Sequence, residues 1–229
     1  MATAGYNSRI YFNERRLSPY LNSIDFAKPF DTEDVSTFES VDKKHLAIKR
    51  DGTSSISGWW DEDVDSQLEG VFDGSEGYLS YYPGGTAAGA YGKLAKVIMG
   101  SLDTNSGQAG VVDMAGTFQC TELNRSVVSL LTETTYSATA STTGVDGTAQ
   151  TTAGGNAVIH CTAVTGTVSV QFEDSPDNSM WSLLAPAVDI SAVGAQVVSI
   201  SGAIERYTRV TVTLGGGESI TLQAGINRL

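Results

Sequence analysis

The sequence predicts a mainly β protein built from two β-rich segments. Short runs rich in β-branched and aromatic residues recur along the chain, and Gly, Pro, Asn and Asp residues separate them. The composition changes near residue 135. Up to Arg125 the chain has 11 Lys/Arg and 18 Asp/Glu, whereas the remainder has 3 and 8 and is rich in Thr, Ser, Ala, Val and Gly. We therefore expect a domain at residues 1–135, a Ser/Thr/Gly/Ala-rich linker at 136–155, and an independently folding domain at 156–229.

The front segment starts with alternating residues at 6–13, which indicate a half-buried strand, and a second strand is expected at 24–30. Residues 31–50 lie in a long polar stretch without a clean period, which is typical of a functional loop. Alternation returns at 53–60, where Trp59 and Trp60 are expected on opposite faces and buried. Further strands are expected at 78–82, 93–99, 110–120 and 127–131.

One short helix is predicted after Trp60. Val64, Leu68, Val71 and Phe72 follow a helical spacing, and Gly74 is expected to end the helix. Asp61, Asp63 and Asp65 open this helix in a pattern similar to a calcium loop, but Ser66 and Phe72 stand where that loop needs Gly and Glu. A better explanation of these three aspartates is that acidic side chains at the start of a helix interact favourably with its exposed N–H groups.

The rear segment predicts a second antiparallel sandwich. Its runs are separated by turn formers at 154–156, 174–179 and 215–217, so Glu173, Asp174 and Asp177 are expected in a turn. Residues 137–155 leave room for a short strand before it. The predicted strands cover residues 157–164, 167–172, 195–200, 208–214 and 219–224.

The sequence offers no set of residues for catalysis, so we predict no enzyme, no cofactor and no metal. His45 and His160 are the histidines of the chain, and Cys120 and Cys161 are its cysteines. His160 and Cys161 are neighbours on a predicted strand and point to opposite faces, which makes a poor nucleophile–base pair. No spacing of these residues suits zinc. The cysteines fall in different segments and are expected to be buried free thiols. The Gly-rich residues 84–93 lack the Gly and the Ser or Thr of a phosphate loop.

The net charge of −12 disfavours nucleic-acid binding, because binding of that kind needs a basic stripe. No stretch reaches the length of about 20 apolar residues that a membrane span requires, and the first residues lack the apolar core of a signal peptide.

The order of these pieces resembles the tail tube (major tail) protein of long non-contractile-tailed bacteriophages. Residues 6–130 carry the resemblance through the first strand, the loop at 31–38, the segment DGTSSISGWWD at 51–61, the helix, and YYPGG at 81–85. The rear part resembles the Ig-like β-sandwich that some of these proteins append, with VSVQFEDSPD at 168–177, Trp181 and RYTRV at 206–210.

The resemblance implies hexameric rings that stack into a tube around a tape-measure protein, with tail-end proteins as further partners. DNA then passes through the bore during ejection without specific binding. The chain would be made in the host cytoplasm and reside in the virion tail, away from membranes. The loop at 31–50 would reach a neighbouring subunit and become ordered there. Its apolar residues Phe38, Leu46 and Ile48 are the predicted subunit-interface residues, because apolar side chains in an otherwise charged segment are expected to be covered by another surface.

Two other functions fit the composition. One is a capsid decoration protein, whose front segment would bind a capsid lattice. The other is a carbohydrate-binding or adhesin module that uses Trp59, Trp60 or Trp181 to stack against a sugar.

Overall fold

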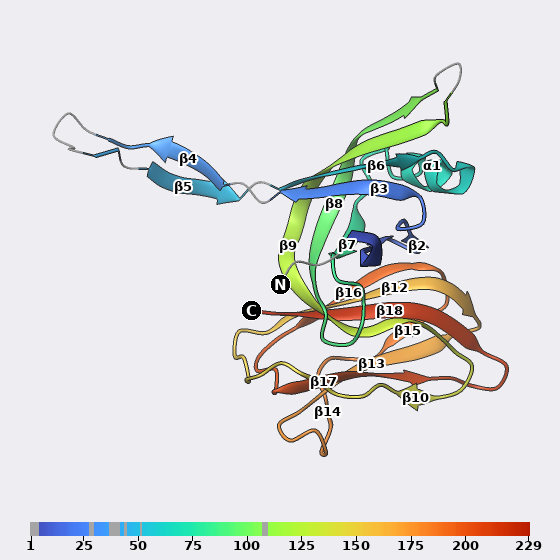
Figure 1. Cartoon of the computed structure of the whole chain (residues 1–229). Helices are drawn as coiled ribbons and strands as arrows, with labels where there is room; N and C mark the ends of the chain where they lie inside the picture. Colours follow the sequence, from blue (N-terminus) through green and yellow to red (C-terminus); the bar gives the residue numbers. More distant parts are fainter. Residues whose placement is uncertain (1–4, 28–29, 37–41, 44, 51, 107–109) are drawn as a thin grey trace. The chain divides into compact units, whose positions relative to one another are not determined.

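The computed structural model describes residues 5–27, 30–36, 42–43, 45–50, 52–106 and 110–229. Within these ranges it does not describe the side chains of residues 6, 30–33, 45–50, 123 and 124. The predicted fold class, mainly β with one short helix, is confirmed for this part of the chain (Figure 1). Each strand pair with a described register is antiparallel.

The chain divides into two compact units. Unit 1 comprises Met1–Pro19, Gly77–Leu94 and Arg125–Leu229, and unit 2 comprises Tyr20–Glu76 and Ala95–Asn124. This grouping does not follow the predicted limits at residues 135 and 156, because the first strands of the chain belong with the rear segment. Independent folding of residues 156–229 stays a prediction.

Unit 1 contains a sandwich of two sheets. One sheet has the order β16-β12-β18-β9 and continues through β8, β7, β1 and β2, and the other has the order β10-β17-β13-β14, with β11 on β17 and β15 on β13. The strands of unit 1, including the two that also enter unit 2, are β1 (Arg9–Phe12), β2 (Arg15–Arg16), β7 (Gly77–Tyr82), β8 (Tyr91–Asn105), β9 (Asp113–Tyr136), β10 (Ala140–Ser141), β11 (Val145–Asp146), β12 (Gly155–Thr165), β13 (Val168–Ser175), β14 (Ser182–Leu183), β15 (Val188–Ile190), β16 (Gly194–Ile200), β17 (Tyr207–Thr213) and β18 (Ser219–Arg228).

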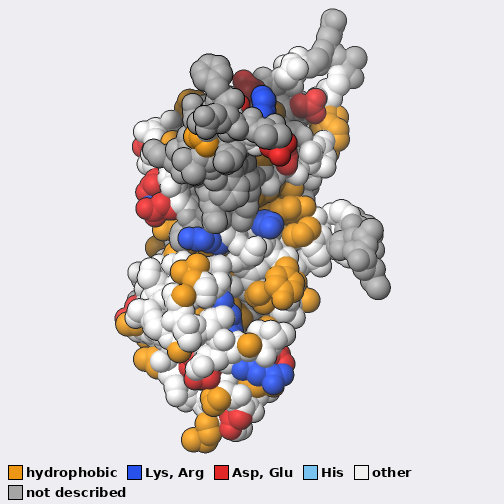
Figure 2. Space-filling model, turned by 90° about the vertical axis from the view of Figure 1, so that its left-hand side faces the viewer, with side chains coloured by type: hydrophobic (Ala, Val, Ile, Leu, Met, Phe, Trp, Pro, Cys, Tyr) orange, Lys and Arg blue, Asp and Glu red, His pale blue; other side chains and the backbone are white. Residues whose placement is uncertain are grey.

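The five predicted rear strands correspond to β12, β13, β16, β17 and β18. Their alternating apolar residues meet in one core between the two sheets, where Ile159, Phe172 and Val212 are fully buried. The predicted linker contributes β10 and β11, which pair with β17. On the face of unit 1 that Figure 2 shows, apolar side chains form small separate groups among polar ones. Such scattered groups are ordinary for a protein surface.

Strand β12 is buried on both faces, which explains why the first strands of the chain belong to unit 1. Ile159 and Cys161 point into the sandwich core, whereas Val158 packs with Tyr11 of β1 and Tyr82 of β7. The hydroxyl of Tyr82 accepts a bond from Gln223 Nε2 at 3.1 Å. Alternation in the sequence cannot reveal this second contact, because a strand covered on both faces reads as a continuous apolar run.

Strands β3 (Leu21–Ala27) and β6 (Thr53–Trp59) of unit 2 belong to the ten-stranded sheet, off the strand order given above. Strand β3 pairs with β6, which pairs with β9, and β8 follows β9 in the order of the sheet. Strands β4 (Phe30–Asp34) and β5 (His45–Arg50) form a separate two-stranded sheet. Most of the residues predicted as two strands at 110–120 and 127–131 form the single strand β9, since no Gly or Pro lies between the two runs.

Helix α1 (Glu62–Glu69) buries Val64 and Leu68, as the spacing predicts. Asp61 is its N-cap, and the Asp61 carboxylate accepts a bond from the backbone N–H of Val64 at 3.3 Å, which confirms the capping interpretation. The predicted end at Gly74 is wrong: Gly70 caps the helix, and Phe72 lies beyond it, 51% exposed.

Candidate assembly surface

The segment predicted as an irregular loop forms a β-ribbon. We call residues 30–50 the ribbon; within them β4 and β5 pair from Phe30↔Arg50 to Asp34↔His45 with one register irregularity. Figure 1 shows the ribbon extending beyond the ends of β3 and β6, on the side away from α1. The segment is mostly polar and its one apolar run, at 46–48, is too short to mark a strand in the sequence. An isolated two-stranded ribbon is marginally stable by itself, so a ribbon of this kind gains from a further partner.

The three predicted interface residues belong to the ribbon. Leu46 and Ile48 lie on β5, and their side chains fall outside the described residues, as does Phe38 entirely. Their role in a subunit contact stays a prediction. Where the ribbon is described, Lys43 Nζ lies 3.7 Å from the Asp34 carboxylate, and both side chains are exposed.

One face of the unit 2 sheet carries small polar side chains. We call it the hydroxyl face and define it by residues directly paired across β3, β6 and β9. In these pairs Ser55 lies between Asp25 and Thr117, and Ser57 lies between Ser23 and Ala115. Thr53, Ser55, Ala115 and Thr117 are exposed, whereas the alternate residues are buried on the opposite face. The defining residues are Ser23, Asp25, Ala27, Thr53, Ser55, Ser57, Ala115, Thr117 and Gln119, and none is basic.

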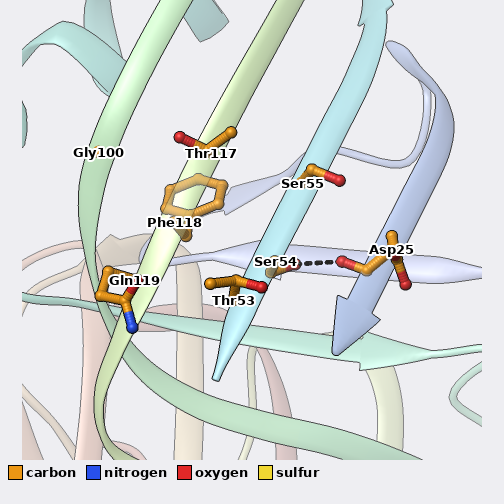
Figure 3. A pocket seen from close by; sticks show the side chains of 8 residues that line it. All are labelled: Asp25, Thr53, Ser54, Ser55, Gly100, Thr117, Phe118 and Gln119. Atoms are coloured by element: carbon orange, nitrogen blue, oxygen red, sulfur yellow. Dashed lines mark hydrogen bonds between the residues drawn. The ribbon is translucent and has the colours of Figure 1, made fainter. Parts of the chain in front are cut away.

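A pocket of about 310 Å³ lies at one end of these strands (Figure 3). Asp25, Thr53, Ser54, Ser55, Gly100, Thr117, Phe118 and Gln119 line it. The Ser54 hydroxyl donates to the backbone carbonyl of Asp25 at 2.8 Å. The lining combines hydroxyls, one amide, one aromatic ring and one carboxylate. Asp25 is the one lining residue that could act as a general base beside a hydroxyl nucleophile.

The opposite end of β6 carries two exposed tryptophans. Trp59 is 49% exposed and Trp60 is 40% exposed, so the expectation that they are buried is wrong. Strand β6 ends at Trp59, and the Trp60 N–H donates to the Val112 carbonyl at 2.9 Å, which places Trp60 beyond the alternation of the strand. Val111, 64% exposed, adds to the same end of the sheet. We call Trp59, Trp60 and Val111 the aromatic end.

The third tryptophan does not offer an open stacking surface. The Arg209 guanidinium lies over the Trp181 ring, 4.2 Å from its centroid, and Arg209 also bonds to Glu173 at 2.7 Å. A sugar stacked on this face of Trp181 would have to displace Arg209 and its ion pair.

The remaining polar residues noted in the sequence have structural contacts. Asp177 lies in the predicted turn, where N–H groups of Ser179 and Met180 hold the pKa of its carboxyl well below the usual range. Glu173 and Asp174, expected in the same turn, instead lie on β13, and Asp174 accepts a bond from the Glu205 N–H. No cluster of three or more potential metal ligands occurs within the described ranges.

His160 and Cys161 point to opposite sides of β12, as predicted. His160 is fully buried, with Nε2 2.7 Å from the Ser80 hydroxyl and Nδ1 2.7 Å from the Asn13 carbonyl. Burial lowers the pKa of His160 to about 4. Cys161 is buried and Cys120 is half-buried, and neither forms a disulfide with a described residue. Burial raises the pKa of the Cys161 thiol to about 11, which disfavours the reactive thiolate.

In the described part of the chain, no helix is both long and apolar enough to cross a bilayer.

No family model and no curated protein sequence matches the chain. Among solved structures, the tail of an empty gene transfer agent particle is similar to 53% of this chain over 96% of its own, with 16% identity and a TM-score of 0.44. The tail tube of phage SPP1 covers 53% of this chain and 77% of its own, with 8% identity and a TM-score of 0.46. The Dit hub protein of the same phage covers 95% and 98%, with 8% identity and a TM-score of 0.37.

Proposed function

We propose that the chain is the tail tube protein of a long non-contractile-tailed bacteriophage. It assembles into hexameric rings that stack into a tube, first around a tape-measure protein and then around DNA, and contacts tail-end proteins at the ends of the tube. Unit 1 contributes an Ig-like sandwich to this assembly. The chain acts as a structural protein of the virion, without a cofactor or a reaction.

The observation that carries this proposal is the architecture of unit 2. Among the described strands, β3 pairs on one side only, with β6, and the ribbon extends beyond the ends of these two strands. Sheet edges of this kind are either protected or used for pairing with another chain. A ribbon on one subunit that contacts a different surface on the next makes a heterologous contact, which closes into a ring when the rotation permits.

The hydroxyl face supports the second part of the proposal, a bore through which DNA passes. A bore lined with Lys or Arg would retain duplex DNA, because each neutralised phosphate releases counterions and adds affinity. Serine, threonine and alanine present neither such charges nor bulky side chains. We therefore assign the hydroxyl face to the bore wall.

Purified protein is expected to form rings or tubes of constant diameter in negative-stain microscopy, with a matching heavy species in sedimentation velocity. The chain should also leave short duplex DNA unbound at physiological salt, because its net charge of −12 repels phosphates. Monomers at every protein concentration would contradict the proposal. Monomers that bind glycans would favour the adhesin instead.

Ser55→Lys is expected to make assembled tubes retain duplex DNA. The substitution adds a cation to the hydroxyl face in each subunit, and DNA retention should fall steeply as salt increases. Ser182→Lys is the matched control, because Ser182 is exposed on β14 in the rear sheet. Retention is measured by co-sedimentation of tubes with labelled duplex. Equal retention of DNA by both variants would contradict the assignment of the hydroxyl face to the bore wall.

A further inference from the structure

Strand β16 forms one edge of the ten-stranded sheet. It stands at the end of the strand order, and among the described strands it pairs with β12 alone. It comprises seven residues, Gly194–Ile200, and is about 23 Å long. Alternate residues of an antiparallel strand direct their N–H and C=O groups to one neighbour, so the other residues of β16 direct theirs away from β12. The edge therefore presents a row of backbone groups to which a further strand can bond.

This edge lacks the usual protection against pairing. Natural sheet edges are kept apart by charged side chains, by proline, or by being very short. No charged residue and no proline occurs from Ile190 to Ile204. The strands at the other ends of the described sheets are two residues long or include a charged residue: β2, β3, β4, β5, β10, β11, β14 and β15. Strand β16 is thus the exception among them.

Contacts on both faces hold β16 in its extended form. Val198 packs against the sandwich core, and Val197 packs against the cluster that contains Tyr11 and Tyr82. Gln196 and Ser199 are exposed. A strand that is already ordered loses little conformational entropy when another strand joins its edge.

We propose that β16 pairs with β16 of a second copy of this chain, antiparallel and about a two-fold axis. A second copy supplies what the edge requires, which is an ordered strand of equal length with unpaired backbone groups. Each chain has a net charge of −12, so two copies repel each other in general. Along this edge, however, each cross-strand pair joins two uncharged residues, whichever residue lies on the axis.

This contact is distinct from the contacts of the proposed ring. Successive subunits of a six-membered ring are not related by a half turn, so a two-fold contact cannot join them. The β16 pair therefore joins chains that do not belong to the same ring. A contact between two strands of seven residues is small, and small interfaces are typical of weak, reversible association.

Amide hydrogen exchange of the wild type across a protein-concentration series tests the pair. The N–H groups of residues 194–200 that point away from β12 are expected to exchange quickly in dilute samples. In concentrated samples they should exchange roughly tenfold more slowly, because pairing places them in a hydrogen-bonded ladder. Sedimentation velocity should show a species of twice the mass over the same range, and negative-stain microscopy of the same samples reports ring formation separately.

Gln196→Lys is expected to abolish this protection. It places a cation at an exposed position on each edge, and the two-fold axis brings the two cations together. The added positive charge changes the net charge from −12 to −11, so weaker pairing cannot come from stronger repulsion between whole chains. Ser182→Lys makes the same change of charge at an exposed residue of β14 and should pair like the wild type. A thermal melt verifies that both variants fold.

The outcomes separate this contact from the proposed function. Exchange at 194–200 that does not change with concentration, or equal pairing by the wild type and Gln196→Lys, would overturn the two-fold contact and leave the proposed function in place. Protection of β16 that requires another protein would overturn the choice of a second copy. Chains that pair through β16 and never form rings would overturn the proposed function and leave this contact in place.

Discussion

A chain that ends at Thr135 is expected to lose the folded state of unit 1. The cut removes β18, whose residues pair with β9 from Ile220↔Tyr136 to Ile226↔Val128, and it removes β12, which covers Tyr11 and Tyr82. Leu130 and Leu131 would also lose the sandwich core. Exposing these four side chains costs about 6–12 kcal/mol, which is comparable to the whole stability of a domain.

This expectation bears on the predicted domain limits, which imply that residues 1–135 fold without the rest. Circular dichroism and urea unfolding of the fragment provide the measurement, and we expect no cooperative transition from unit 1. The matched control is co-expression of residues 1–135 with 136–229, because the strand pairs can then re-form between two pieces. A fragment that unfolds cooperatively by itself, with the stability of the full chain, would support the predicted limits.

Acid is expected to destabilise unit 1 through His160. The Asn13 carbonyl can only accept, so Nδ1 carries the proton and the neutral ring accepts at Nε2 from the Ser80 hydroxyl. The Tyr11 ring stacks on the imidazole with centroids 5.5 Å apart. A second proton would place a charge among buried groups and require the Ser80 hydroxyl to turn around.

The direction follows from the pKa of His160, which is about 4 in the folded chain against 6.5 for the exposed side chain. Stability from the neutral ring is complete above about pH 6.5 and is lost as the pH falls towards 4, because the unfolded chain then binds the proton first. The shift corresponds to a loss of about 3 kcal/mol at most.

The measurement is urea unfolding of the wild type and of His160→Gln at pH 7.5, 6.0, 5.0 and 4.5. The variant is expected to be less stable at pH 7.5, since it loses buried hydrogen bonds and packing. The difference in unfolding free energy between the two proteins should then shrink as the pH falls, because only the wild type loses stability when this ring becomes protonated. The carboxylates titrate in both proteins and do not change the difference. A difference that stays constant across this range would contradict the role of His160.

The sequence by itself determined the β character of the chain and most of its strands. Runs such as AVIHCTAV at 157–164 have few alternatives, because β-branched residues between turn formers favour strands wherever they fold. The same holds for the start of α1, where Asp61 caps the helix and Val64 and Leu68 repeat at four residues. These signals are local, and the structure confirms them.

Only the tertiary structure decided which strands belong together and which surfaces stay exposed. Strand β12 packs on Tyr11, about 150 positions earlier in the chain, and periodicity carries no information on such a partner. The sequence did not reveal the ribbon because this segment is mostly polar and its apolar run at 46–48 is short. The exposure of Trp59 and Trp60 depends on β6 ending where α1 begins. Local propensity fixes most elements of this chain, whereas contacts between residues far apart in sequence decide which of its surfaces stay exposed.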